Sequence, residues 1–129
     1  MHRVKKILIV DDNHANRRIL ESHIKSFHPD VIVVHAEHGG HAWQLMDEQA
    51  HEIDVVFSDI EMPEMDGKEL MIKINDKHPH VGVVLMSGRG RPDGYMGPFL
   101  QKPDESMDTE KVRAVIKKVL DIMHSRGLD

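Results

Sequence analysis

Acidic, hydroxyl and amino side chains follow the short hydrophobic segments of this sequence. Asp11 and Asp12 come directly after the first segment, and Asp59 comes two residues after the third. Ser87 follows the fourth segment, and Lys102 follows the fifth. These five residues can act together only if the fold gathers the ends of the segments at one place.

The chemistry of this set points to phosphoryl transfer. Three clustered carboxylates repel one another and raise their own pKa values unless a cation lies among them. Oxygen ligands with open positions suit Mg²⁺, which keeps bound waters and shares phosphate oxygens. A carboxylate beside Mg²⁺ can attack a phosphoryl group, and such transfer depends mainly on positioning and charge neutralisation. Lys102 offers a point charge and Ser87 a hydrogen bond, so the set predicts an aspartyl-phosphate site.

Five hydrophobic segments predict the strands that must position these side chains. Four of them are continuous and rich in β-branched residues, which is typical of strands covered on both faces of a parallel sheet. The fifth is shorter and weaker. The predicted strands are residues 7–10, 31–34, 55–57, 81–86 and 99–100.

Between the strands, hydrophobic residues recur with the period of a helix. Pro29 ends the first helix, and Asp108 or Ser106 can cap the start of the last. The predicted helices are residues 15–27, 42–50, 67–77 and 112–123. Alternating strands and helices predict a parallel sheet with helices on both faces. Ligands of such sheets lie outside the carboxyl ends of the strands, so the five candidate residues are expected to converge there.

Composition narrows the class of protein. The chain has 129 residues, 40% hydrophobic and 30% charged, with no cysteine and a formal net charge of −5. These values predict one globular domain over residues 1–129, with no output domain. They exclude disulfide and thiol chemistry and argue against nucleic-acid binding. With no segment long enough for a membrane span or a signal peptide, a cytoplasmic location without membrane association is expected.

Eleven histidines are unusual for this length, and three of them recur every third residue. His35, His38 and His41 raise the question of a zinc site. Zinc ligands are usually spaced to share one helix face or a tight knuckle, with a second cluster elsewhere. No second cluster is apparent, so solvated side chains near a helix start are the favoured interpretation.

Each candidate residue alone has a simpler explanation. An acidic pair after a strand is often a helix cap, here together with Asn13. A serine after a strand is usually a turn residue, and a lysine before proline is usually a solvated loop charge. Short motifs carry a high risk of false positives. The prediction rests on the coincidence of these features at successive strand ends.

With these residues placed, nearly the whole chain resembles the receiver domain of two-component response regulators. Residues 7–12 resemble the first-strand signature with its acidic pair, residues 59–67 the phosphoacceptor segment, and residues 99–103 the fifth-strand signature. The resemblance implies a flavodoxin-like, doubly wound α/β fold with strand order 2-1-3-4-5. It also implies a switch rather than an enzyme, phosphorylated by a histidine kinase or histidine phosphotransfer protein and read by an unidentified downstream protein.

The resemblance also implies a role for individual residues. Asp59 would be the phosphoacceptor, Ser87 the switch hydroxyl and Phe99 the switch aromatic, which otherwise is a plain core residue. Lys102 would contact the phosphoryl group, and its bond to Pro103 would be cis. The implied Mg²⁺ ligands are Asp12 and Asp59 through carboxylate oxygens, Asp11 through water, and Glu61 through its main-chain carbonyl.

Two further residues are expected to tune the phosphoryl lifetime. Glu61 lies two residues after Asp59, and Arg89 lies two residues after Ser87. If the strand ends align, both project over the phosphoryl site and could form an ion pair that hinders attacking water. The alternative is two independent solvated charges, since exposed ion pairs are usually weak.

The sequence departs from the family pattern at three places. Ser87 stands where threonine is common, Asp104 stands where phenylalanine is common, and the segment after Ser87 is short. That segment, residues 88–98, contains four glycines and two prolines. Glycine costs about 1 kcal/mol and interior proline about 3 kcal/mol in a helix. We therefore predict a loop with at most one helical turn in place of the usual fourth helix, with Arg89, Arg91 and Tyr95 available on a mobile segment.

Two alternative functions are compatible with parts of the pattern. A haloacid-dehalogenase-like phosphatase also uses an aspartate after its first strand, but needs a carboxylate two residues later, where Asn13 follows Asp11. A degenerate receiver would be expected to lack an acidic residue or the lysine, and this sequence retains both. A magnesium-dependent phosphorylation assay separates the three functions.

Overall fold

The computed structural model describes residues 4–102 and 107–127. Five parallel strands form one sheet in the order β2-β1-β3-β4-β5, which is the predicted order. The strands are β1 (Lys6–Val10), β2 (Ile32–Ala36), β3 (Val55–Asp59), β4 (Gly82–Ser87) and β5 (Phe99–Gln101). The helices are α1 (His14–Phe27), α2 (Gly39–Gln49), α3 (Gly67–Lys77) and α4 (Thr109–Ser125). None of these helices is both long and apolar enough to cross a membrane.

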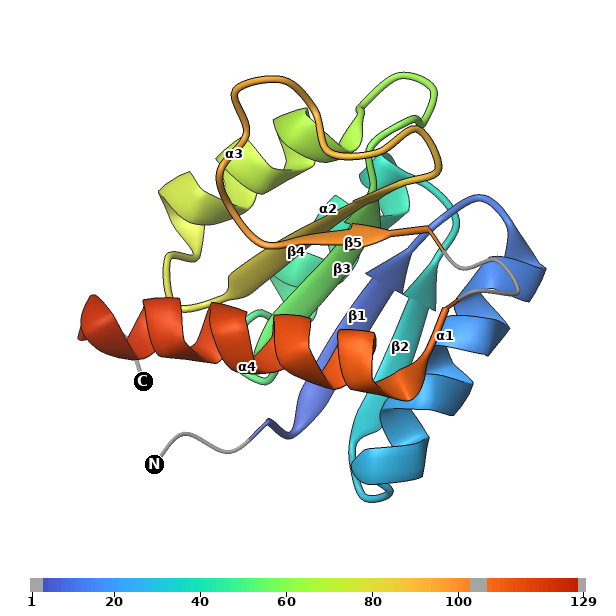
Figure 1. The fold of residues 1–129 in the computed structure, drawn as a ribbon. Helices are drawn as coiled ribbons and strands as arrows, with labels where there is room; N and C mark the ends of the chain where they lie inside the picture. The colour runs from blue at the N-terminus through green and yellow to red at the C-terminus, as the bar shows by residue number, and fades with distance from the viewer. Residues whose placement is uncertain (1–3, 103–106, 128–129) are drawn as a thin grey trace.

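Helices cover both faces of the sheet, as the alternating pattern predicts (Figure 1). Successive residues of a strand point to opposite faces, so Ile7 and Ile9 join the core beneath α1 and α4. Leu8 and Val10 join the core beneath α2 and α3. The two cores fix the strands on both sides and hold the carboxyl ends of β1, β3 and β4 at one edge.

Polar side chains begin the helices where the strands end. Asn13 accepts a hydrogen bond from the Asn16 amide at the start of α1, and Asp66 accepts one from Glu69 at the start of α3. Such caps satisfy amides that have no partner inside the helix. Asp108 caps α4, so one of the two predicted caps is confirmed, and Ser106 lies outside the described residues.

Strand β2 differs from the prediction. The sequence predicts residues 31–34 covered on both faces, but β2 extends over Ile32–Ala36 and is partly exposed, with 56% of Ile32 accessible. β2 lies at one edge of the sheet and pairs only with β1. A run of β-branched residues does not distinguish an edge strand from a central one, so hydrophobicity alone overestimated the burial.

The segment between β4 and β5 is a loop of turns with no helix, as its glycines and prolines predict. Gly90 and Gly94 have positive φ angles of 90° and 79°, which glycine adopts without strain. Arg91 donates hydrogen bonds to the carbonyls of Tyr95 and Gly97, at 3.2 and 2.7 Å. The Tyr95 hydroxyl donates to the carbonyl of Pro98, at 2.8 Å. The side chains of Arg91 and Tyr95, which were predicted to be available, therefore hold the loop itself together.

Candidate phosphoacceptor site

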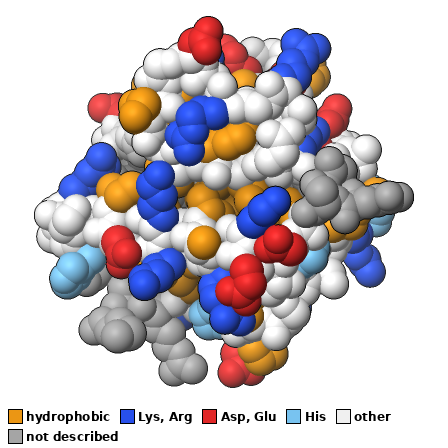
Figure 2. Space-filling model, in the orientation of Figure 1, with side chains coloured by type: hydrophobic (Ala, Val, Ile, Leu, Met, Phe, Trp, Pro, Cys, Tyr) orange, Lys and Arg blue, Asp and Glu red, His pale blue; other side chains and the backbone are white. Residues whose placement is uncertain are grey.

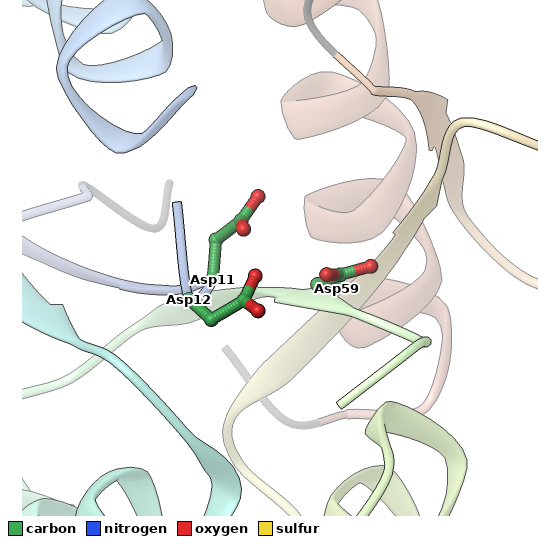
Figure 3. Close-up of side chains that lie close together, drawn as sticks. All are labelled: Asp11, Asp12 and Asp59. Atoms are coloured by element: carbon green, nitrogen blue, oxygen red, sulfur yellow. The ribbon is translucent and has the colours of Figure 1, made fainter. Parts of the chain in front are cut away.

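The three aspartates meet at the carboxyl edge of the sheet. Asp11 and Asp12 follow β1, and Asp59 is the last residue of β3. Each offers one carboxylate oxygen, and these oxygens lie within 4.8 Å of one another (Figure 3). Asp11 and Asp59 are buried, whereas Asp12 is exposed. The predicted convergence of these side chains is thus present in the structure.

Lys102 neutralises part of this charge. Its ammonium nitrogen lies 2.9 Å from Asp59 Oδ2 and 3.4 Å from Asp11 Oδ2. Its main-chain amide donates to the carbonyl of Ser87, at 3.0 Å, so pairing with the end of β4 places the lysine over the site. Burial by itself lowers the pKa of Lys102, but the ion pairs with Asp59 and Asp11 outweigh it, and its pKa is raised. The lysine therefore remains a cation.

The buried carboxylates are nevertheless short of positive charge. Burial raises the pKa of Asp59 to about 6, against the opposing effect of Lys102. Burial also raises the pKa of Asp11. Asp11 Oδ1 accepts a hydrogen bond from the Asn13 amide, at 2.9 Å, whereas Oδ2 has only the ion pair with Lys102 and accepts no hydrogen bond in the described part of the chain. One lysine shared by buried carboxylates, beside a third aspartate, fits a divalent cation with oxygen ligands.

Ser87 and Glu61 contact each other beside Asp59. The Glu61 amide donates to Asp59 Oδ1 at 3.2 Å, which brings its carboxylate toward β4. There the Ser87 hydroxyl donates to Glu61 Oε1 at 2.8 Å and accepts from the Arg89 amide at 3.0 Å. Burial raises the pKa of Glu61, but the Ser87 hydrogen bond and the Arg89 charge are among the effects that outweigh it, and its pKa is lowered. Glu61 and the main-chain amide of Arg89 thus both contact Ser87, but the two side chains, both in the described part of the chain, form no ion pair with each other.

Gly67 lets α3 approach the acceptor strand closely. A Cβ atom at this position would overlap the main-chain carbonyl of Asp59. The Gly67 amide donates to the carbonyl of Ile60, at 3.0 Å. Any larger residue would push the start of α3 away and shift the end of β3, so Gly67 supports the position of Asp59.

Sequence reasoning missed Arg17, a buried residue with 5% of its surface accessible. Its guanidinium donates to the main-chain carbonyl of Asp11, at 2.5 Å, and to His35 Nδ1, at 3.2 Å. It therefore fixes the end of β1, where Asp11 and Asp12 begin. The sequence contained a sign of this burial. Arg17 lies on the same helix face as Leu20 and Ile24, the face that packs against the sheet.

The histidines of the predicted 35–41 cluster have separate structural roles. His35 Nε2 lies 2.6 Å from Glu21 Oε1, and His35 Nδ1 accepts from Arg17. His38 Nδ1 accepts from the amide of His41 and begins α2. The sequence predicted α2 to start after Gly39 and Gly40, but the His38 cap moves its start to Gly39.

Phe99 lies at the edge of the core under α2 and α3. The Arg91 guanidinium carbon lies 5.4 Å from the centre of its ring. The ring is half-buried beside the loop that follows Ser87. The predicted cis bond between Lys102 and Pro103 falls outside the described residues.

Burial of Asp59 predicts an unusual effect on stability. Because its folded pKa of about 6 lies above the ordinary value of 3.8, the folded protein binds more protons between these values, and stability falls as pH rises through about 6. Without metal, Asp59→Asn should therefore raise the free energy of unfolding by about 1–3 kcal/mol at about pH 8, at roughly 1.4 kcal/mol for each pKa unit. At about pH 4 the difference should be small. Urea unfolding in EDTA at both pH values measures it, and an equal or lower stability of the variant at the higher pH contradicts the assigned environment.

Sequence comparison agrees with this geometry. The family described as response regulator receiver domain matches residues 7–97. The chain is 31% identical over 119 residues to the 3′,5′-cyclic-nucleotide phosphodiesterase regA of Dictyostelium discoideum, covering 90% of this chain and 15% of that protein. It is 40% identical over 84 residues to histidine kinase 3 of Arabidopsis thaliana, covering 65% and 8%. The chain thus spans a small part of these relatives.

A solved structure shows the same fold. The signal receiver domain of an HD domain-containing protein from Pseudomonas fluorescens Pf-5 superimposes with a TM-score of 0.72 and 26% identity. The match covers 95% of this chain and 99% of that one. Fold, site and sequence agree, and the chain belongs to the response regulator receiver domain family of two-component systems.

Proposed function

We propose that this protein is a phosphorylation-activated signalling switch whose acceptor is Asp59. The observation that carries the proposal is the position of Lys102, whose ammonium group reaches both Asp59 and Asp11 among three carboxylates. The three carboxylates could bind a divalent cation, and the Lys102 ammonium could contact the oxygens of a phosphoryl group. The proposed donors are a histidine kinase or a histidine phosphotransfer protein, in the cytoplasm.

The proposed metal ligands are the carboxylates of Asp12 and Asp59, Asp11 through water, and the main-chain carbonyl of Glu61. Bound Mg²⁺ would neutralise charge on the transferring phosphoryl oxygens. Lys102, at the carboxyl end of β5, would share that task. The Oδ2 atom of Asp11 supports this ligand set, since Lys102 at 3.4 Å is the one cation near it among the described residues and must also serve Asp59.

In the proposed transfer, a carboxylate oxygen of Asp59 attacks the phosphorus of a phosphohistidine. A P–O bond forms as the P–N bond breaks, and its electron pair returns to the imidazole nitrogen. Deprotonated Asp59 is the reactive form, and Lys102 opposes the rise of its pKa to about 6. A bound cation would lower this pKa further. Hydrolysis reverses the state, when water attacks phosphorus and releases inorganic phosphate and the free carboxylate.

Ser87 is the proposed sensor of the phosphoryl group. In the unmodified protein its hydroxyl donates to Glu61. A phosphoryl group on Asp59 offers a more strongly charged acceptor nearby. Movement of the hydroxyl toward it would release Glu61 and shift residues 88–98, which follow directly, and Phe99 beside them. A downstream protein would read that change.

Incubation with acetyl phosphate and Mg²⁺ tests the function. We expect the intact mass to rise by one phosphoryl group, to need Mg²⁺, and to fall back as the acyl phosphate hydrolyses. Steady turnover of a phosphoester without a stable modification would indicate a phosphatase instead. Absence of any modification would indicate a receiver that binds partners without phosphorylation.

Glu61 and Arg89 should set the lifetime of the phosphorylated state. Both lie at the mouth of the site around Ser87, where they can restrict the approach of water. Replacing both by alanine should change the dephosphorylation rate by about fivefold to thirtyfold, since access of water is worth on the order of 1–2 kcal/mol here. The decay of labelled phosphoprotein measures it. Glu69→Ala with Arg18→Ala, two exposed substitutions elsewhere, is the matched control, and equal rates in all three proteins remove the idea.

A further inference from the structure

A groove of about 410 Å³ lies between α3, the 88–98 loop and α4, on the face seen in Figure 2. We call it the methionine groove, because Met71 of α3, Met96 of the loop and Met123 of α4 all line it. Val83 and Pro98 also contribute to its apolar wall. Figure 2 shows hydrophobic side chains gathered in the middle of this face, with lysine, arginine and acidic side chains around them.

The groove exists because the chain makes no helix between β4 and β5. Turns occupy residues 88–98 and leave part of the sheet between α3 and α4 without a helical cover. Met96, which lines the groove, is left 85% exposed. Contiguous exposed apolar surface with a polar rim is typical of a protein interaction site.

The methionine side chains of the lining favour a protein ligand, because they can adjust their conformation to its surface. Methionine is unbranched and polarisable, and it is frequent on surfaces that bind amphipathic helices. Helices α3 and α4 flank the groove on two sides, and the side chains of an added helix can pack between those of its neighbours. An inserted helix would thus cover the surface that the loop leaves open.

The charge around the groove determines which charge the polar face of that helix should carry. Arg126 is the one charged residue among the described residues that line it. Ile122 borders both this groove and a second hollow on α4, which holds Lys117, Lys118 and Asp121. The two lysines and Arg126 have no side-chain hydrogen bond or ion pair with the described residues. Among the residues that the structure describes, cations thus outnumber acids along this rim, although the whole chain has a net charge of −5.

We propose that the methionine groove binds an acidic amphipathic helix of a partner protein. Hydrophobic residues of that helix at positions i, i+3 or i+4, and i+7 would enter the groove. Its carboxylates would pair with Arg126 and the lysines of α4. The groove is present without a phosphoryl group, so the inference goes beyond the proposed switch and can fail or succeed separately from it.

A second copy of this chain fits the groove less well. A two-fold dimer places the same patch of both copies face to face. Arg126 and the α4 lysines of one copy would then meet those of the other, and like charges in contact oppose association. An acidic partner has no such penalty.

Two matched libraries of displayed amphipathic helical peptides test the proposal on the whole, unphosphorylated protein. Both vary the apolar positions, and they differ only in carrying glutamate or lysine on the polar face. We expect binders from the glutamate library, with amide NMR shifts concentrated on the groove. Met96→Glu should weaken them at least about tenfold, as expected for loss of a central anchor, and Arg126→Glu should favour the lysine peptides. Ile32→Ser, an exposed hydrophobic substitution on the distant edge strand β2, should change nothing.

Three results would overturn the proposal. The first is binding of the two libraries alike, or of neither. The second is a set of shifts outside the groove, or affinities that Met96→Glu leaves unchanged. The third is a concentration-dependent dimer in sedimentation that Met96→Glu dissociates, which would assign the groove to a second copy.

Discussion

Asp59→Asn should abolish phosphorylation by acetyl phosphate while leaving the protein folded. The amide has nearly the shape of the carboxylate but is a far poorer nucleophile, and removing a nucleophile costs on the order of 10³-fold or more in rate. The variant should keep the fold, because Asp59 is buried at an acidic cluster where loss of one charge relieves repulsion. Intact mass after incubation with donor and Mg²⁺ measures the modification, and circular dichroism measures the fold.

The control for this prediction is Asp66→Asn. Asp66 caps α3 seven residues after the acceptor, and asparagine caps helices about as well as aspartate. We expect this variant to be phosphorylated at the wild-type rate. If Asp59→Asn is modified as fast as Asp66→Asn, the acceptor is a different residue and the assignment is wrong.

Asp12→Ala should weaken Mg²⁺ binding at least about tenfold, the loss expected when one charged ligand of a few-ligand site is removed. Asp12 is the exposed member of the aspartate cluster, so its removal should not disturb the hydrophobic core. Mg²⁺ should bind the wild-type protein without phosphate, since the clustered charges need a cation. Calorimetric titration of both proteins measures the difference.

An exposed acidic residue outside the cluster provides the comparison for the metal prediction. Glu69 lies in the first turn of α3, ten residues after Asp59. Glu69→Ala removes one negative charge without touching the aspartate cluster. If only general electrostatic attraction held Mg²⁺, both variants would lose Mg²⁺ affinity to the same extent. A specific site requires a loss in Asp12→Ala and little change in Glu69→Ala, and unchanged affinity in Asp12→Ala contradicts the site.

Much of the fold was predictable from the spacing of hydrophobic residues and from where glycine and proline interrupt it. Continuous β-branched runs identified the central strands, and helical stripes identified the helices to within a few residues. The site followed from a geometric rule, since parallel strands place their carboxyl ends at one edge. The absent helix was predictable for a local reason, because the glycines and prolines of residues 88–98 oppose helix formation wherever the segment lies.

The features that escaped prediction depend on contacts between distant segments. The exposure of β2 follows from its edge position, which its own residues do not specify. Arg17 reaches the Asp11 carbonyl only when α1 packs beside β1. The contact of Ser87 with Glu61 joins the ends of two strands and depends on side-chain direction. The raised pKa of Asp59 likewise follows from burial that a lone aspartate in a sequence does not reveal.

The most direct test of the central claim is to locate the phosphoryl group chemically. Borohydride reduces an acyl phosphate to an alcohol, which marks the modified carboxylate through later digestion. After incubation with acetyl phosphate and Mg²⁺, reduction and peptide mass spectrometry should find the modification at position 59, and no labelling when Mg²⁺ is omitted. A reduced residue at Asp11, Asp12 or any other carboxylate, with position 59 intact, would contradict the account.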